Sequence, residues 1–151
     1  SQDGILIAAT NHPQMLDSAV WRRFQTIIEL PAPESEEIRR YLEQFPKVAD
    51  LNSITESQWT MIVNEFNGMS YSDIKDVVQN ILKKGILKRK TEIESCDYLA
   101  EIYFFKNHGN YSQEEIIKYI NENGVSQKQI ARYFNISERQ VRNYLGKGVI
   151  K

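Results

Sequence analysis

The first candidate functional residues are a polar pair, Thr10 and Asn11, and two adjacent arginines, Arg22 and Arg23. The polar pair ends a continuous apolar run at residues 5–9, which is typical of a buried strand of the parallel type. Two hydrogen-bonding side chains then stand at the carboxyl end of that strand, where open α/β sheets bind their ligands. Taken singly, such residues are more often a plain strand end and solvated arginines. Only their combination indicates a site.

Two further elements must position these residues. Asp17 is a good N-cap, so we expect a short helix over residues 18–21 that ends directly before the two arginines. Residues 26–31 are mostly β-branched or apolar, and they predict a second strand that Pro31 and Pro33 bring to an end.

The order of these motifs resembles the second region of homology of AAA ATPases. In that region a strand ends in Ala-Thr-Asn, Leu-Asp-x-Ala follows, and Arg-Phe leads into the last core strand, as at residues 9–11, 16–19 and 23–24 here. The resemblance implies that Asn11 is the sensor-1 residue, which helps to position the water that attacks the γ-phosphate. It also implies a fold in which these two strands end an α/β core.

The same resemblance gives the arginines a role. Arg23, directly before Phe24, matches the arginine finger supplied to the nucleotide of the neighbouring subunit, and Arg22 matches the other arginine of the family. A fixed guanidinium stabilises the negative charge that spreads over the γ-oxygens during phosphoryl transfer. Many members have Pro-Gly between the two arginines, whereas here they are adjacent, so either of them could reach the phosphate. A finger acts across a subunit boundary, which implies a homo-oligomer.

Composition limits the class of protein. The chain has 151 residues, 41% of them hydrophobic and 26% charged, as in an ordinary globular protein, and no stretch is apolar for long enough to span a bilayer. The single cysteine, Cys96, suits a cytoplasmic setting, and no membrane partner is expected. His12 and His108 lack companion ligands, so we expect no metal site.

No Gly-x-x-x-x-Gly-Lys-Ser/Thr loop occurs in the sequence, and no apolar strand ends in adjacent acidic residues that could hold Mg²⁺. We therefore expect this chain to be the carboxy-terminal piece of a longer protein. ATP and Mg²⁺ would bind to the intact protein only, and the piece alone should bind neither and should be inactive.

Apolar residues at helical spacing predict four helices, at residues 33–47, 55–67, 70–90 and 95–107. The third begins with a sequence, residues 68–74, that resembles the lid of AAA ATPases beside the adenine and ribose. The resemblance makes Gly68, Tyr71 and Ser72 candidate nucleotide-binding residues, although Tyr71 is bulkier than the small residue usual there. The structural alternative is a plain helix amino terminus.

Three shorter helices follow, each opened by a capping box: Ser112 with Glu115, Ser126 with Gln129, and Ser137 with Gln140. The last two are joined by Asn135-Ile136, and residues 127–145 resemble a helix-turn-helix motif. Asn tolerates the positive φ that such a turn requires. Residues 125–151 contain six basic residues and one acidic residue, whereas residues 1–124 carry a net charge of −6. The basic end of the chain indicates an anionic partner.

DNA is the partner that this pattern favours. On the last helix, Arg can pair with guanine edges and Gln or Asn with adenine edges, while basic residues on either side meet phosphates. The candidate DNA-binding residues are Lys128, Arg132, Arg139, Gln140, Arg142, Asn143 and Lys147. The alternative is a three-helix module that binds a protein and has a solvated basic face.

The sequence as a whole predicts a mainly α chain with three parts: residues 1–32 as the carboxy-terminal end of an AAA α/β core with two strands, residues 33–108 as a helical lid, and residues 109–151 as a helix-turn-helix module. The predicted function is that of the carboxy-terminal part of an AAA ATPase with a DNA-binding tail. The alternatives are a protein-remodelling AAA ATPase whose tail binds a protein, and a non-enzymatic DNA-binding regulator.

Overall fold

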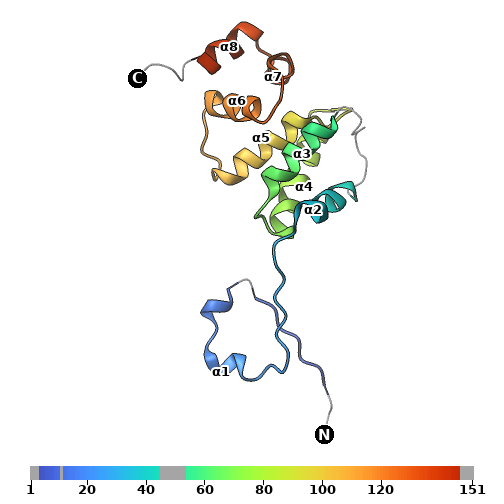
Figure 1. Cartoon of the computed structure of the whole chain (residues 1–151), viewed down its shortest axis with the longest axis vertical. Coiled ribbons are helices and arrows are strands. Elements are labelled where there is room, and N and C mark those ends of the chain that lie inside the picture. Colours follow the sequence, from blue (N-terminus) through green and yellow to red (C-terminus); the bar gives the residue numbers. More distant parts are fainter. Residues whose placement is uncertain (1–3, 11, 45–53, 147–151) are drawn as a thin grey trace. The chain divides into compact units, whose positions relative to one another are not determined.

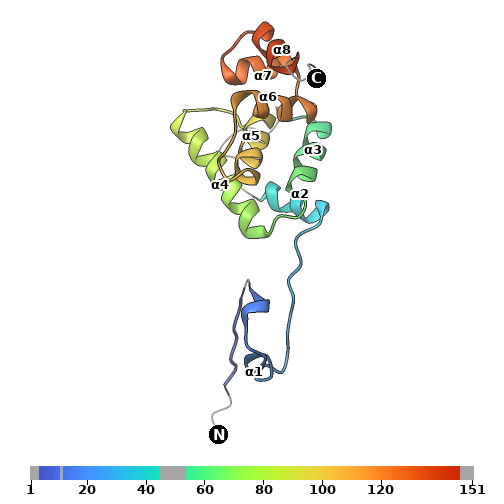
Figure 2. The same ribbon diagram turned by 90° about the vertical axis from the view of Figure 1, so that its left-hand side faces the viewer.

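The computed structural model describes residues 4–10, 12–44 and 54–146. The chain divides into two compact units, Ser1–Leu30 and Pro31–Lys151. Figures 1 and 2 show the helices of the two units.

The first unit contains two short helical elements, the 3₁₀ turn η1 (Pro13–Met15) and helix α1 (Ser18–Trp21). The Asp17 carboxylate accepts a hydrogen bond from the Ala19 amide at 2.9 Å, so it satisfies one of the free N–H groups at the start of the helix. The predicted short helix and its cap are therefore confirmed.

The two predicted strands do not form in the described part of the first unit, which contains no strand in residues 4–10 and 12–30. No backbone hydrogen bond joins residues 5–10 to residues 26–30, and the apolar side chains are open: Ile5 is 94% exposed and Leu30 is 88% exposed. An apolar, β-prone sequence becomes a strand only when a neighbouring strand takes up its backbone N–H and C=O groups. Residues 4–10 and 12–30 supply no such neighbour.

The second unit begins with helices α2 (Ser35–Glu43), α3 (Glu56–Phe66), α4 (Tyr71–Leu87) and α5 (Ser95–Lys106). These confirm the four predicted helices, with ends that differ by a few residues; residues 45–47 of the first prediction lie outside the described residues. The predicted caps at Thr55 and Ser70 form complete capping boxes with Gln58 and Asp73. Helix α5 packs against both α3 and α4, and α2 packs against α3.

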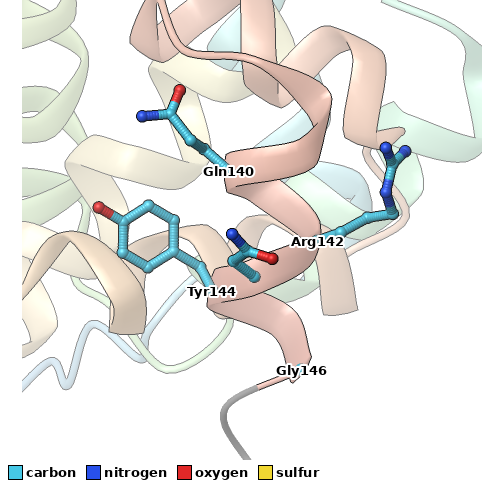
Figure 3. Close-up of a pocket in the computed structure, with 5 residues that line it drawn as sticks. Gln140, Arg142, Tyr144 and Gly146 are labelled. Carbon is cyan, nitrogen blue, oxygen red and sulfur yellow. The ribbon is translucent and has the colours of Figure 1, made fainter.

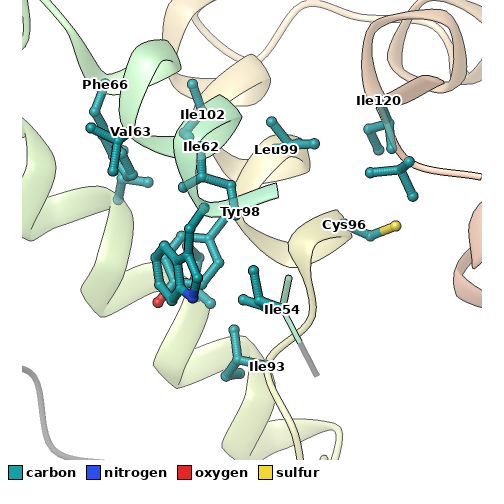
Figure 4. Close-up of a cluster of buried hydrophobic side chains, with 14 of the residues drawn as sticks. Ile54, Ile62, Val63, Phe66, Ile93, Cys96, Tyr98, Leu99, Ile102 and Ile120 are labelled. Carbon is teal, nitrogen blue, oxygen red and sulfur yellow. The ribbon is translucent and has the colours of Figure 1, made fainter. Parts of the chain in front are cut away.

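A shared apolar core holds these helices together (Figure 4). Ile62, Phe66 and Ile102 have no exposed surface, and the rings of Trp59 and Tyr98 meet edge to face at 5.5 Å between centroids. Each fully buried aliphatic or aromatic side chain contributes about 1.5–3 kcal/mol relative to an exposed one. Burial of this apolar stripe, more than local propensity, stabilises the helices.

The chain continues through helices α6 (Gln113–Glu122), α7 (Gln127–Phe134) and α8 (Glu138–Gly146). The three predicted Ser-to-Glu or Ser-to-Gln capping pairs are all present as hydrogen bonds. Asn135 ends α7 in the left-handed region, with φ of 54° and ψ of 47°, as the sequence predicts for this turn. Ile130, Ala131 and Val141 are buried where α6, α7 and α8 contact one another.

Helix α6 also contacts α5, and its buried residues belong to the same core as those of α3, α4 and α5. The turn between α5 and α6 contains His108 and Gly109, both with positive φ, and the Gly109 amide donates to the Phe104 carbonyl at 3.0 Å. The three-part division at residues 32–33 and 108–109 stays a prediction. Within the described ranges, no helix is long and apolar enough to cross a bilayer.

Candidate functional sites

The two arginines lie where α1 ends. Arg22 is the C-cap of α1, and the Arg23 amide donates to the Val20 carbonyl at 3.1 Å. Both side chains are exposed, and neither guanidinium forms an ion pair with a carboxylate of the described residues. Their positive charge is therefore not neutralised within this part of the chain, and both could accept an anion.

Asn11, the predicted sensor residue, lies outside the described residues. The residues before and after it are hydrogen-bonded to each other: the His12 amide donates to the Thr10 hydroxyl at 3.0 Å. The roles of Asn11, Arg22 and Arg23 in phosphoryl transfer stay predictions.

The predicted nucleotide-binding residues of the second unit share one turn at the start of α4. Gly68 has a φ of +85°, so the chain reverses there through a conformation that side chains rarely adopt. Ser70 caps the helix, and Tyr71 and Ser72 are its first two residues, both exposed. The Tyr71 ring meets the Tyr41 ring of α2 edge to face at 5.2 Å. The start of a 17-residue helix carries partial positive charge, which suits an anionic ligand.

The third candidate site is the outer face of α8 (Figure 3). Arg139, Gln140, Arg142 and Asn143 are exposed, whereas Val141 is fully buried on the opposite side. A shallow hollow of about 440 Å³ lies along the helix, and Figure 3 shows the residues that line it: Gln140, Arg142, Asn143, Tyr144 and Gly146. Helix α8 therefore presents its polar side chains as one surface.

The polar side chains of this surface differ in the hydrogen bonds and ion pairs that they make within the protein. The Gln140 side-chain oxygen accepts from the Ser137 amide at 2.9 Å, which leaves the Gln140 amide nitrogen as the group that can contact a partner. The Arg142 guanidinium lies 4.0 Å from the Glu138 carboxylate, both side chains being more than half exposed. Arg139 makes no ion pair with any described residue. Of the two arginines of α8, Arg139 is thus the one whose charge no carboxylate of the described residues pairs with.

The predicted phosphate-binding residues that flank α8 differ in whether an acidic side chain already pairs with them. Lys128 is exposed in the first turn of α7, whereas the Arg132 guanidinium forms an ion pair with Glu94, the residue that caps α5. Lys147 lies outside the described residues. A phosphate contact through Arg132 would have to share that guanidinium with Glu94.

Sequence reasoning missed the polar cluster that joins α3, α5 and α6. The Glu65 carboxylate accepts from the Tyr119 hydroxyl at 2.6 Å and from the Lys106 ammonium at 2.5 Å. Burial alone would raise the pKa of Glu65, but these two hydrogen bonds outweigh it and the pKa lies below its usual value. Burial, together with the Glu65 hydrogen bond, raises the pKa of Tyr119. No local sequence signal pairs residues that are 54 positions apart.

No group of three or more His, Cys, Asp or Glu side chains that could hold a metal occurs in residues 4–10, 12–44 and 54–146.

Comparison with known proteins finds two kinds of similarity. An uncharacterised AAA family ATPase, y4kL, from Sinorhizobium fredii is 30% identical over 96 residues, which is 63% of this chain and 28% of that protein. Mouse vacuolar protein sorting-associated protein 4B is 36% identical over 57% of this chain and 19% of its own length. The Arabidopsis thaliana ATPase family AAA domain-containing protein FIGL1 is 33% identical over 57% of this chain and 14% of its own.

Separately, a family described as FaeA-like protein matches residues 112–147, which include α6, α7 and α8. No solved structure matches the chain at a comparable level of significance. The chain spans less than a third of the length of these curated relatives. The similarity to AAA ATPases thus extends over about 60% of the chain at 30–36% identity and supports the predicted resemblance.

Proposed function

We propose that this chain is the carboxy-terminal part of an AAA ATPase that binds and hydrolyses ATP as a homo-oligomer. The observation that carries the proposal is the similarity, over more than half of the chain, to two relatives that are named as AAA family ATPases. In this proposal Asn11 orients the attacking water, and Arg22 or Arg23 stabilises the developing charge on the γ-phosphate of a neighbouring subunit.

The described residues fit two parts of that chemistry. Two exposed guanidinium groups without ion-pair partners among those residues suit the stabilisation of a polyphosphate. The turn at Gly68 and the exposed first residues of α4, Tyr71 and Ser72, suit the base and ribose of a nucleotide. ATP and Mg²⁺ belong to the intact protein in this proposal, and Mg²⁺ would neutralise part of the phosphate charge there.

The test is the ATPase rate of the intact protein with Arg22→Ala or Arg23→Ala. We expect one of the two variants to lose turnover by at least 10³-fold, the range found for arginine fingers, while nucleotide binding persists. Arg40→Ala is the matched control, since Arg40 is an exposed arginine that pairs only with Glu36 on its own helix in the described structure. Turnover at the control's rate in both variants would contradict the finger assignment.

We further propose that the α6–α8 region is a helix-turn-helix module that binds DNA. The exposed face of α8, with Arg139, Arg142 and Asn143, supports this proposal, because such side chains read base edges and phosphates. The left-handed turn at Asn135 supports it as well, since it lets α7 and α8 follow each other across a short link.

A protein-remodelling ATPase whose tail binds a protein partner fits equally well. Two observations favour it: one relative is named for vacuolar protein sorting, and another, from Methanothermobacter marburgensis, is named as a putative 26S proteasome regulatory subunit homologue. Fluorescence anisotropy of this chain with a labelled duplex separates the two. Salt-sensitive binding supports the DNA-binding tail, whereas no binding at low salt favours the protein partner.

A further inference from the structure

The carboxy-terminal helices are joined to the α2–α5 bundle by polar contacts at two places. At the first, Glu65 of α3 binds Tyr119 of α6 and Lys106 of α5 with one carboxylate. Its side chain is 25% exposed, so these hydrogen bonds are partly shielded from water. Charge-assisted hydrogen bonds of this kind are stronger and more directional than those between neutral groups. These hydrogen bonds therefore fix both the distance and the orientation of α6 relative to α3 and α5.

The second place lies where α5 begins. The Lys90 ammonium contacts the Asp97 carboxylate at 2.6 Å and stands 4.8 Å from the centre of the Tyr133 ring of α7. The Arg132 guanidinium of α7 pairs with Glu94. Because Lys90 follows α4 and Asp97 belongs to α5, this cluster attaches α7 to two elements of the bundle.

Apolar contacts also join α6 to the bundle. The Tyr103 and Tyr119 rings lie 4.7 Å apart, and Ile117 and Ile120 of α6 have no exposed surface. They belong to one core with α3, α4 and α5 (Figure 4). Two groups of helices joined by a mobile linker would each need a core of its own. Here one core crosses from the bundle to α6.

We propose that α6, α7 and α8 move with the α2–α5 bundle as one rigid body, with Glu65 and Tyr119 as the residues that fix their relative orientation. The functional consequence rests on the proposed function. If the bundle is the lid of an AAA ATPase, each change in lid orientation turns the exposed face of α8 by the same angle. A partner bound to α8 and a nucleotide at the lid are then coupled mechanically through this interface.

The test measures residual dipolar couplings of backbone amides in the whole chain, without nucleotide or DNA. Couplings from α3–α5 and from α6–α8 should fit one alignment tensor. In the double variant Glu65→Gln with Tyr119→Phe, the aromatic ring at position 119 remains but the hydrogen bonds to the charged carboxylate are lost. We expect the tensor magnitude fitted to α6–α8 to fall by roughly a third or more relative to that of α3–α5, while chemical shifts within each group keep their helical values.

Tyr111→Phe is the matched control, because Tyr111 lies in the same aromatic cluster but is 46% exposed. It should leave a single tensor. Two tensors of different magnitude in the unmodified chain would overturn the rigid-body proposal. A single tensor in the double variant would overturn the role given to Glu65 and Tyr119. Neither result depends on ATP or DNA, so the outcome is separate from that of the proposed function.

Discussion

Replacing the two outward arginines of α8, by Arg139→Gln together with Arg142→Gln, should change how DNA binding depends on salt. Both side chains are exposed, and the Arg142–Glu138 contact at 4.0 Å is a surface ion pair. Such pairs contribute about 0–1 kcal/mol, so the variant should keep its helices and its unfolding midpoint. Any change in DNA affinity then reports on contacts with DNA and not on folding.

The expected size follows from counterion release. Each phosphate neutralised by a protein cation adds about 0.9 to the slope of log affinity against log salt. Losing two contacts should flatten the slope by about 1.8, so between 50 and 200 mM salt the unmodified chain should lose about twelvefold more affinity than the variant. If the arginines contact base edges as well, affinity at low salt also falls, by about 1–3 kcal/mol for each good bidentate pair.

The assay is fluorescence anisotropy with a labelled duplex, recorded at several salt concentrations. Lys75→Gln is the control, since Lys75 is an exposed cation of α4, far from α8 in sequence and without an ion pair among the described residues. It should leave the slope unchanged. Equal slopes for the arginine variant and the unmodified chain would refute the reasoning, as would equal flattening in the lysine variant.

Three further predictions concern stability and reactivity. Phe66→Ala should lower the free energy of unfolding by about 3–5 kcal/mol in urea titrations, because Phe66 is fully buried, whereas Phe105→Ala, at a side chain that is 36% exposed, should cost far less. Asn135→Ala should cost about 1–2 kcal/mol, because the residue has a φ of 54°, and Asn135→Gly should differ little from the unmodified chain in the same assay. Cys96 is 2% exposed and burial raises its pKa to about 12, so a thiol reagent at pH 8 should label it slowly until urea unfolds the chain; immediate labelling of the folded chain would contradict its burial.

The sequence predicted the helices well because their signals are local. Thr55 and Ser70 each stand three residues before a Gln or Asp that completes the cap, and apolar residues follow at helical spacing. The left-handed turn at Asn135 was also predictable, because few residues tolerate positive φ and the link between the predicted helices was short.

What the sequence could not predict depends on contacts between distant residues. The apolar run at residues 5–9 has the composition of a buried strand, yet the structure leaves it exposed, since a strand needs neighbours that the run itself does not encode. The Glu65–Tyr119 bond was invisible for the same reason, because a Glu and a Tyr on separate helices carry no pairing signal. The sequence likewise gives no partner for Arg132, whose guanidinium forms an ion pair with Glu94 in the folded chain.

The exposed apolar run near the amino terminus has a practical consequence for handling this polypeptide. Ile5, Leu6 and Ile7 are 94%, 76% and 85% exposed in a row, with backbone groups that no described residue pairs. Such a segment is a template for intermolecular β pairing, so we expect the chain to self-associate as its concentration rises. A charged residue in place of Leu6 would oppose that pairing, and light scattering against concentration would register the difference.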